Sequence, residues 1–267
     1  MGADIKSLRV RMKSVDSTLH LTKAMGLVAS SKIHRANLNM KKSKAYAAAI
    51  AEIIDTLTLS PEAMHSPYMQ ENKSGKTKLI VIAGDRGLAG GYNANIFRFM
   101  RDYPQAEVIA IGKRAATRYG QEIISSEHFS AEDAAALSKS LCESFKNGEF
   151  DRLGIVSTTY VSMMTQTAGV QWVLPLTKAE NAEPQSMLFE PNEMEILNSA
   201  VPLYVSGVLM SAIRESFASE VAARRVAMDS AGKNAQQMLD DLQLNYNMAR
   251  QGAITQEITE IVAGSGE

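Results

Sequence analysis

Residues 217–262, FASEVAARRVAMDSAGKNAQQMLDDLQLNYNMARQGAITQEITEIV, carry the pattern that decides the fold. Between residues 217 and 249, mostly apolar or small residues recur at alternating intervals of four and three, like the a and d positions of a heptad repeat. These positions are Phe217, Val221, Arg224, Met228, Ala231, Ala235, Met238, Leu242, Asn245 and Ala249. No proline follows Pro202, which we assign to the first turn of a helix. At about 1.5 Å per residue, a helix from there to residue 262 spans roughly 90 Å, so it needs a second helix as a partner.

The N-terminal part of the chain supplies that partner. Sixteen positions keep the same three-and-four spacing over about eight heptads, well beyond the three or four that indicate a coiled coil. They are Ile5, Leu8, Met12, Val15, Leu19, Thr22, Gly26, Ala29, Ile33, Ala36, Met40, Ser43, Ala47, Ile50, Ile54 and Leu57. Two long helices separated by a compact middle segment must pack antiparallel. The C-terminal helix is the longer of the two, so we expect its last turns to extend beyond the first helix.

The middle of the chain has a different pattern. Short continuous apolar runs are typical of strands buried on both faces, and they alternate here with helical segments. Strands are predicted at 78–83, 107–112, 153–159, 169–176 and 187–189, with a further one beginning at Ile123-Ile124. Helices are predicted at 94–103, 114–119 and 131–147, the last capped by Ser130 with Asp133 in its first turn. The order indicates a mostly parallel sheet covered by helices.

The predicted fold class is therefore α/β, a long antiparallel two-helix coiled coil with an inserted Rossmann-like βα domain. The Ser-Pro steps at Ser60-Pro61 and Ser66-Pro67 and the polar run after them indicate a linker. The predicted division has four parts. They are an N-terminal coiled-coil helix over 1–59, a linker over 60–77, a central α/β domain over 78–192 and a C-terminal coiled-coil helix over 193–267.

Composition narrows the class of protein. The 267 residues are 45 % hydrophobic and 21 % charged, which is ordinary for a folded soluble domain. We find no run of eighteen apolar residues and no export or transit signal at the start, so no transmembrane segment is predicted. The single cysteine, Cys142, excludes an internal disulfide and suits a reducing compartment. The expected location is cytoplasmic.

The glycine-rich stretch over residues 84–91 follows a predicted strand and precedes a helix, where phosphate-binding loops occur. It lacks the Lys-Ser/Thr pair of a P-loop, and its glycines do not have the dinucleotide-binding spacing. A tight turn with close strand–helix packing is the favoured interpretation. The alternative is a small-ligand or phosphate-binding enzyme that uses this loop. The loop residues of interest are Asp85, Arg86, Gly87, Gly90 and Gly91.

No catalytic, metal or cofactor site is predicted. The four histidines, His20, His34, His65 and His128, have no spacing that would place two on one helix face. Cys142 has no histidine in register on its helix, and no nucleophile elbow occurs.

Two surfaces favour interaction with partners. Residues 1–60 carry ten basic and four acidic side chains, so the first helix would attract an acidic protein surface or nucleic acid, unless this is simply a solvated face. The end of the C-terminal helix carries an apolar stripe at helical spacing, formed by Ile254, Ile258, Ile261 and Val262. Unless this tip folds back on the first helix, it is an exposed apolar helix end, and such ends mark interaction sites.

These segments together resemble the gamma subunit of F-type ATP synthases, over the whole chain and in the right order. The resemblance is carried by Ser14-Val15, Leu21-Thr22-Lys23-Ala24-Met25 and Val28-Ala29-Ser30-Ser31-Lys32, by Asp85-Arg86-Gly87-Leu88-Ala89-Gly90-Gly91-Tyr92-Asn93, by Ser219-Glu220, Ala227-Met228 and Asn234-Ala235, and by Tyr246-Asn247-Met248-Ala249-Arg250-Gln251 and Ile254-Thr255-Gln256-Glu257-Ile258-Thr259-Glu260-Ile261-Val262. The last motif is highly specific.

The resemblance implies a central rotor shaft that couples ion translocation to ATP synthesis or hydrolysis, itself without catalytic residues. The implied partners are the ring of alpha and beta subunits, the epsilon subunit and the membrane c-ring, at the cytoplasmic face of a bacterial plasma membrane. It implies no nucleic acid partner. Motif matching assigns rotor–stator contacts to Lys23, Met25, Arg224, Arg250, Gln251, Thr255 and Glu257.

The sequence departs from the family pattern at three places. Arg225 stands where the family usually has methionine, and Gly84 where serine or threonine is common. The tail over residues 264–267, Gly-Ser-Gly-Glu, replaces the usual small apolar end.

Overall fold

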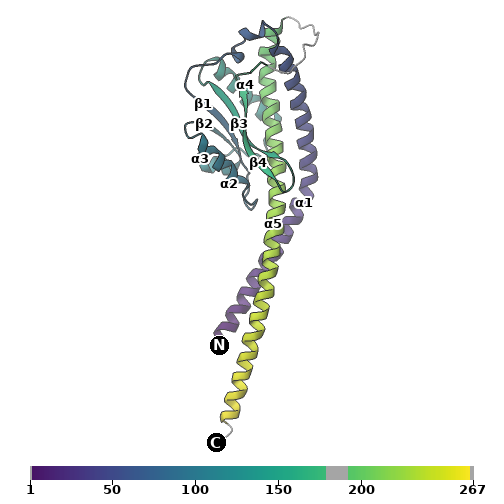
Figure 1. The fold of residues 1–267 in the computed structure, drawn as a ribbon, viewed down its shortest axis with the longest axis vertical. Coiled ribbons are helices and arrows are strands. Elements are labelled where there is room, and N and C mark those ends of the chain that lie inside the picture. Colours follow the sequence, from purple (N-terminus) through teal and green to yellow (C-terminus); the bar gives the residue numbers. More distant parts are fainter. Residues whose placement is uncertain (1, 179–191, 265–267) are drawn as a thin grey trace. The chain divides into compact units, whose positions relative to one another are not determined.

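The computed structural model describes residues 2–178 and 192–264, in which a four-stranded sheet comes between two long helices in the order of the chain (Figure 1). The first long helix is α1 (Gly2–Thr58) and the second is α5 (Glu193–Gly264). The elements between them are β1 (Thr77–Ile82), α2 (Tyr92–Phe99), β2 (Glu107–Ile111), α3 (Lys113–Tyr119), α4 (Ala131–Lys146), β3 (Arg152–Tyr160) and β4 (Gln166–Leu174). The predicted class, an α/β domain inserted between two long helices, is confirmed.

The sheet has the strand order β2-β1-β3-β4. β1 is parallel to β2 and to β3, whereas β4 is antiparallel to β3, so the sheet is mixed. Side chains alternate between the faces of a strand. Leu79 and Val81 of β1 therefore join the core under α2 and α3, while Ile80 and Ile82 join the core with α4 and α5. The α/β part is a three-layer sandwich.

The heptad phase predicted for α1 is correct. All sixteen predicted positions are buried or half-buried, and Leu19, Ala29, Ala36, Ile54 and Leu57 are among the most buried residues of the chain. The sequence from residue 60 to residue 77 is packed as well, since Ala63 and Tyr68 lie in the core with α4 and α5.

Two details of these elements differ from expectation, and a third is not tested. Ile123-Ile124 forms no strand. These residues lie in the loop after the short helix α3, and the Ile124 carbonyl oxygen accepts a hydrogen bond from Gly112 N. Pro202 lies well inside α5 and not in its first turn. The backbone hydrogen bond that proline removes is outweighed there by burial of Val201 before it and Val205 after it. The strand predicted at 187–189 and the polar loop before it lie outside the described residues.

Within the described residues, α5 is long and apolar enough in an 18-residue window, with mean hydropathy 1.6, to cross a membrane by composition alone. Half of that window is buried inside the protein. Val201, Val205, Leu209 and Ile213 are fully buried in the core, so packing against the sheet accounts for the apolar character of this part of α5.

Contacts divide the chain into two compact units. Residues Met1–Ser30 and Arg224–Glu267 form one, which we call the helix-pair unit, and Ser31–Ala223 form the other, the α/β unit. Both long helices pass from one unit to the other. The sequence-based division, by contrast, places its boundaries at the ends of the long helices.

In the helix-pair unit, every second contact position predicted for α5 is wrong. The residue that is buried or half-buried there lies one position later in the sequence. Gly232 is buried and Leu239 and Tyr246 are half-buried, whereas the predicted Met238 and Asn245 are exposed. The positions that face α1 are Met228, Gly232, Ala235, Leu239, Leu242, Tyr246, Ala249 and Ala253. They still alternate by four and three, so the heptad is real and its second contact position lies one residue later than predicted.

Candidate functional site

Three contacts fix how the helices of the helix-pair unit align. Arg9 Nη2 donates to the Tyr246 hydroxyl at 2.8 Å, and a Cβ on Gly232 would lie 3.5 Å from Thr22 Oγ1. Arg225 Nη1 donates to the Gly26 carbonyl oxygen at 3.0 Å. Residue numbers fall along α1 as they rise along α5, so the helices are antiparallel, and α5 continues beyond the start of α1.

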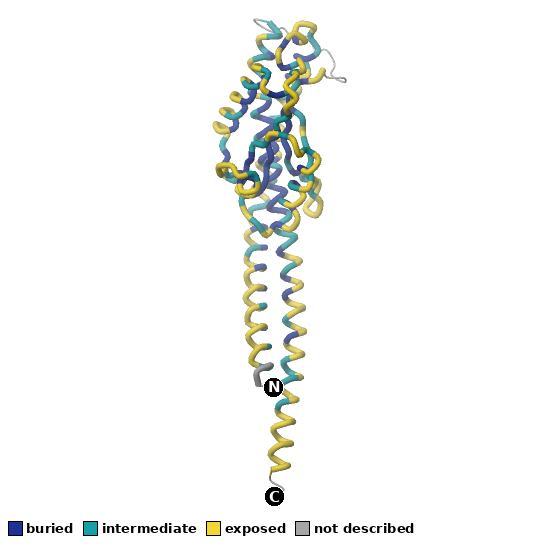
Figure 2. The backbone as a smooth tube through the Cα atoms, turned by 90° about the vertical axis from the view of Figure 1, so that its left-hand side faces the viewer, coloured by how far each residue is buried: buried dark blue, intermediate teal, exposed yellow. Residues whose placement is uncertain are grey.

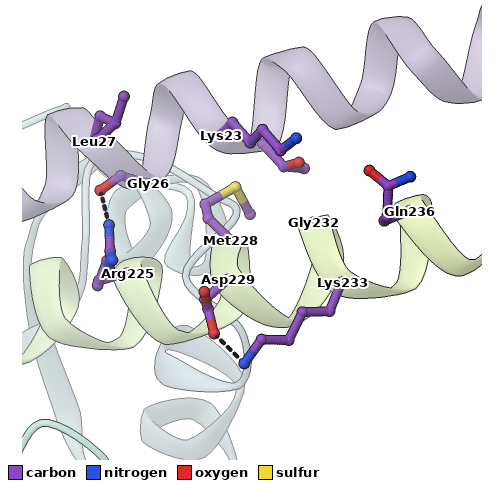
Figure 3. A pocket seen from close by; sticks show the side chains of 10 residues that line it. Lys23, Gly26, Leu27, Arg225, Met228, Asp229, Gly232, Lys233 and Gln236 are labelled. Carbon is purple, nitrogen blue, oxygen red and sulfur yellow. Dashed lines mark hydrogen bonds and ion pairs between the residues drawn. The ribbon is translucent and has the colours of Figure 1, made fainter.

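A groove of about 510 Å³ lies between the two helices of this unit (Figure 3). Gly26 and Gly232 contribute only backbone atoms to its lining. Its lining comprises Thr22, Lys23, Gly26, Leu27, Arg225, Met228, Asp229, Gly232, Lys233 and Gln236. Lys23, Arg225 and Lys233 outnumber the one carboxylate, Asp229, so the groove is basic.

The charges in the groove are partly paired. Asp229 Oδ2 lies 2.9 Å from Lys233 Nζ, and this hydrogen bond lowers the pKa of Asp229. The guanidinium of Arg225 is directed to the Gly26 carbonyl (Figure 3). Lys23 remains exposed at the rim. An anionic side chain of a partner could approach this surface.

The last turns of α5 are exposed throughout (Figure 2). Ile254, Ile258, Ile261 and Val262 are 47 %, 55 %, 67 % and 65 % exposed. The spacing of four and three places Ile254, Ile258 and Ile261 on one face. The tip does not fold back on α1, and its apolar stripe is open to a partner from outside the chain.

The loop after β1 is held by the side chain of Asp85. Its carboxylate accepts hydrogen bonds from Lys113 N at 2.9 Å, Ser125 Oγ at 2.7 Å, Ser126 N at 3.2 Å and Glu127 N at 3.0 Å. Burial raises the pKa of Asp85, but these hydrogen bonds outweigh it and leave the pKa below its ordinary value. Asp85 therefore ties the end of β1 to the loop before α4.

Glu127 in that same loop joins a second group of charges. Its carboxylate lies 2.9 Å from Lys32 Nζ on α1 and 3.4 Å from Arg86. The hydrogen bond from Lys32, ahead of the opposing effect of burial, lowers the pKa of Glu127. These contacts fasten the glycine-rich loop to α1.

The glycines of the loop are needed for close packing. A Cβ on Gly84 would lie 2.7 Å from the Glu220 carboxyl carbon, and one on Gly87 would lie 2.8 Å from Arg114 Nη2. Gly112 has φ +97°, and a Cβ there would lie 1.9 Å from the Ala83 carbonyl oxygen. Side chains of the protein itself thus occupy the space beside Gly84 and Gly87. This arrangement favours the tight-turn interpretation over a phosphate-binding loop.

Among the described residues, no three His, Cys, Asp or Glu side chains come together as metal ligands. Cys142 is fully buried in the core, and burial raises the pKa of its thiol to about 12. A thiol of this kind is a packing residue rather than a nucleophile.

The seven residues assigned to rotor–stator contacts all lie in the helix-pair unit. Arg250, Gln251, Thr255 and Glu257 are exposed and gather near the tip. Lys23 is exposed, while Met25 and Arg224 are half-buried. The loop residues Asp85, Arg86, Gly87, Gly90 and Gly91 lie in the α/β unit, away from this set in the chain.

The groove is not predicted from the sequence. Arg225 departs from the family pattern, but nothing local to it indicates its bond to Gly26. The signal was present as a pair of glycines, Gly26 and Gly232, within heptad-patterned helices, where glycine costs stability and therefore indicates close approach.

Comparison with known proteins decides the family. A family model described as ATP synthase matches residues 4–266. The ATP synthase gamma chain of Alkaliphilus metalliredigens is 38 % identical over 285 residues, covering 99 % of each chain. The chain belongs to the ATP synthase gamma chain family. A sodium-ion-specific ATP synthase gamma chain of Acetobacterium woodii is 35 % identical, again over 99 % of each chain.

Solved structures agree at the level of the fold. A chain from the mitochondrial ATP synthase of Euglena gracilis, in an assembly of OSCP, F1 and c-ring, matches with a TM-score of 0.69 and 17 % identity. That match covers 98 % of this chain and 94 % of the other. A chain of the Euglena rotor matches with a TM-score of 0.64 and 16 % identity, over 95 % and 100 % of the two chains.

Proposed function

We propose that this chain is the central rotor shaft of an F-type ATP synthase, coupling ion translocation through the membrane sector to ATP synthesis or hydrolysis by rotation. The match of an ATP synthase family model over residues 4–266 and the likeness to ATP synthase gamma chains support this role. The structural observation that carries it is the free end of α5, whose exposed apolar stripe extends past the start of α1. A shaft that ends inside a protein ring requires such an end.

The chemistry of the tip suits a bearing. Apolar contacts are non-directional, so a ring of apolar side chains can enclose Ile254, Ile258 and Ile261 without fixing one rotational position. Hydrogen bonds would do the opposite, because they depend on direction. We assign this sleeve to the ring of alternating alpha and beta subunits.

The remaining contacts to the ring are proposed to be polar except for that of Met25. Lys23 and Met25 on α1 and Arg224 on α5 would meet the moving loops of the beta subunits. Arg250, Gln251, Thr255 and Glu257 would contact the ring nearer the tip. Long-range attraction between the basic first helix and acidic beta-subunit loops would act at many angles of rotation.

The chain itself contributes no catalytic residue in this proposal, and ATP chemistry takes place on the beta subunits. The α/β unit would stand with the epsilon subunit on the c-ring, placing the chain at the cytoplasmic face of a bacterial plasma membrane.

The division predicted from the sequence is retained as a proposal. It comprises a first helix over 1–59, a linker over 60–77, a central domain over 78–192 and a second helix over 193–267.

The decisive experiment is reconstitution with alpha and beta subunits of matched origin, followed by observation of a bead fixed to the α/β unit during ATP hydrolysis. Stepwise rotation of the bead is the expected result. Paired variants then test the tip: Ile254→Gln with Ile258→Gln should impair rotation, whereas Leu244→Gln, also exposed, serves as the control. A complex that hydrolyses ATP while the bead stays still would overturn the proposal.

A further inference from the structure

One edge of β3 extends past the strand beside it. β1 pairs with β3 from Thr77 opposite Arg152 to Val81 opposite Val156, whereas β3 continues to Tyr160. On its other edge β3 pairs with β4 as far as Tyr160 opposite Gln166. From Ser157 onward, the edge that faces β1 therefore needs other partners for its backbone groups.

Side chains of α5 supply those partners. Ser216 Oγ accepts a hydrogen bond from Thr158 N at 3.2 Å, and Ser219 Oγ donates to the Thr158 carbonyl oxygen at 3.3 Å. Glu215 Oε1 accepts from Tyr160 N at 2.8 Å. Alternate residues of a strand direct their N–H and C=O groups to the same edge, which is why Thr158 and Tyr160 both form hydrogen bonds with α5. We call Glu215, Ser216 and Ser219 the α5 clasp.

The clasp also holds α1. Lys44 Nζ lies 2.7 Å from the same Glu215 oxygen that accepts from Tyr160 N. The side chain of Glu215 is only 13 % exposed. One carboxylate thus joins α1, α5 and the end of β3, all within the α/β unit.

Much of the remaining contact between α5 and the sheet is apolar. Val201, Val205, Leu209 and Ile213 are buried in the core on the sheet's α4 side. Apolar burial is non-directional, so it holds α5 against the sheet without fixing the direction of any single contact. Ser216 and Ser219 are 1 % and 0 % exposed, and hydrogen bonds at buried sites fix both distance and direction.

We propose that the α5 clasp sets the rotational register of α5 against the sheet and carries torque between them, with Glu215 as its positioning residue. This inference rests on the proposed rotor function. Torque that enters through the α/β unit reaches α5 through directional bonds between its side chains and the backbone of β3. Glu215 passes part of the load to α1 through Lys44.

The test uses the whole chain assembled with alpha and beta subunits and the membrane sector. The main variant is Ser216→Ala with Ser219→Ala, and the matched control is Ser230→Ala, an exposed serine on the same helix. We expect ATP hydrolysis to stay within about twofold of wild type, while ATP-driven ion pumping falls severalfold because directional buried bonds are lost. The angular fluctuations of a bead on the α/β unit should widen.

Two more variants separate a torque role from a purely structural one. Thr158→Val removes a buried hydroxyl that has no hydrogen-bond partner and leaves the backbone bonds in place, so pumping should be unchanged. Glu215→Gln keeps an acceptor for Tyr160 N but loses the ion pair with Lys44, so it should have a smaller effect than Glu215→Leu. Ion pumping by Glu215→Asp that exceeds pumping by Glu215→Leu would further support the positioning role of the carboxylate.

The outcomes divide cleanly. If wild-type beads do not rotate, the proposed function itself fails. If wild-type beads rotate and the double serine variant melts at lower temperature but pumps and fluctuates like wild type, the clasp is only a packing feature and the inference is wrong. Wider fluctuations with hydrolysis retained would support it.

Discussion

The guanidinium Nη1 of Arg225 lies 3.0 Å from the carbonyl oxygen of Gly26, so a side chain of α5 bonds the backbone of α1 near the end of the helix-pair unit where Ser30 and Arg224 lie. Because position 26 has no side chain, the helices approach closely enough for this contact. Met228 packs beside it, with its Cβ 3.7 Å from where a Cβ on residue 26 would lie. The bond fixes the register of the two helices at one point.

Replacing Arg225 with methionine should destabilise the helix-pair unit by about 0.5–1.5 kcal/mol, the usual net contribution of one hydrogen bond. Native-state hydrogen exchange of the amides over residues 224–245 measures this locally. Arg250→Met, at an exposed position nearer the tip, is the control and should leave the same amides unchanged. Equal protection in the two variants would contradict a role for the Arg225 bond in holding the helices together.

Two glycine-to-alanine changes should have opposite effects. At Gly84 a Cβ would lie 2.7–2.9 Å from the carboxylate of Glu220, which is only 4 % exposed, so Gly84→Ala should cost about 1–3 kcal/mol through overpacking. At Gly252, a helical position with nothing within 4 Å of the added Cβ, alanine should stabilise α5 by up to about 1 kcal/mol. Thermal unfolding of both variants measures the difference. A neutral Gly84→Ala would show that Glu220 can move aside.

The carboxylate of Asp85 should make the stability of the α/β unit depend on pH at the acid end. Its folded-state pKa is lowered from the ordinary value of 3.8, so the stability it contributes is present above that value and is lost as pH falls through the folded pKa. Asp85→Asn should lower stability at neutral pH and flatten the loss of stability below about pH 4. Denaturant unfolding across pH 3–7 tests this, with the exposed Asp241→Asn as control. Parallel curves for wild type and Asp85→Asn would contradict it.

The sequence predicted the long helices, the inserted α/β domain and the family. It predicted the α1 contact positions correctly because apolar or small residues keep the three-and-four spacing over sixteen positions, whereas the exposed apolar residues of α1 do not keep it. It did not predict the phase of α5, since Ala231 and Gly232 are both small and hydropathy cannot choose between them. Pro202 was assigned to a helix start because local propensity ignores the tertiary packing that keeps it inside α5.

Of the candidate site, the sequence revealed what is local and missed what is long-range. The apolar stripe from Ile254 to Val262 is a pattern within one helix, and its exposure was expected from the unequal helix lengths. The groove requires knowing which residues of α1 and α5 face each other. The bonds from Ser216 and Ser219 to Thr158 link residues about sixty positions apart, so they become visible only in three dimensions.

The corrected phase of α5 gives a direct test of the helix-pair unit. Leu239 is half-buried against α1, whereas Met238, one residue earlier, is 43 % exposed. Leu239→Ala should therefore cost about 1–2 kcal/mol, less than a fully buried leucine because the site is partly open, and Met238→Ala less than about 0.5 kcal/mol. Hydrogen exchange of α5 amides between residues 232 and 246 compares the two variants under identical conditions. If Met238→Ala proves the more damaging change, the heptad read from the sequence was right and the packing described for this unit is shifted by one residue.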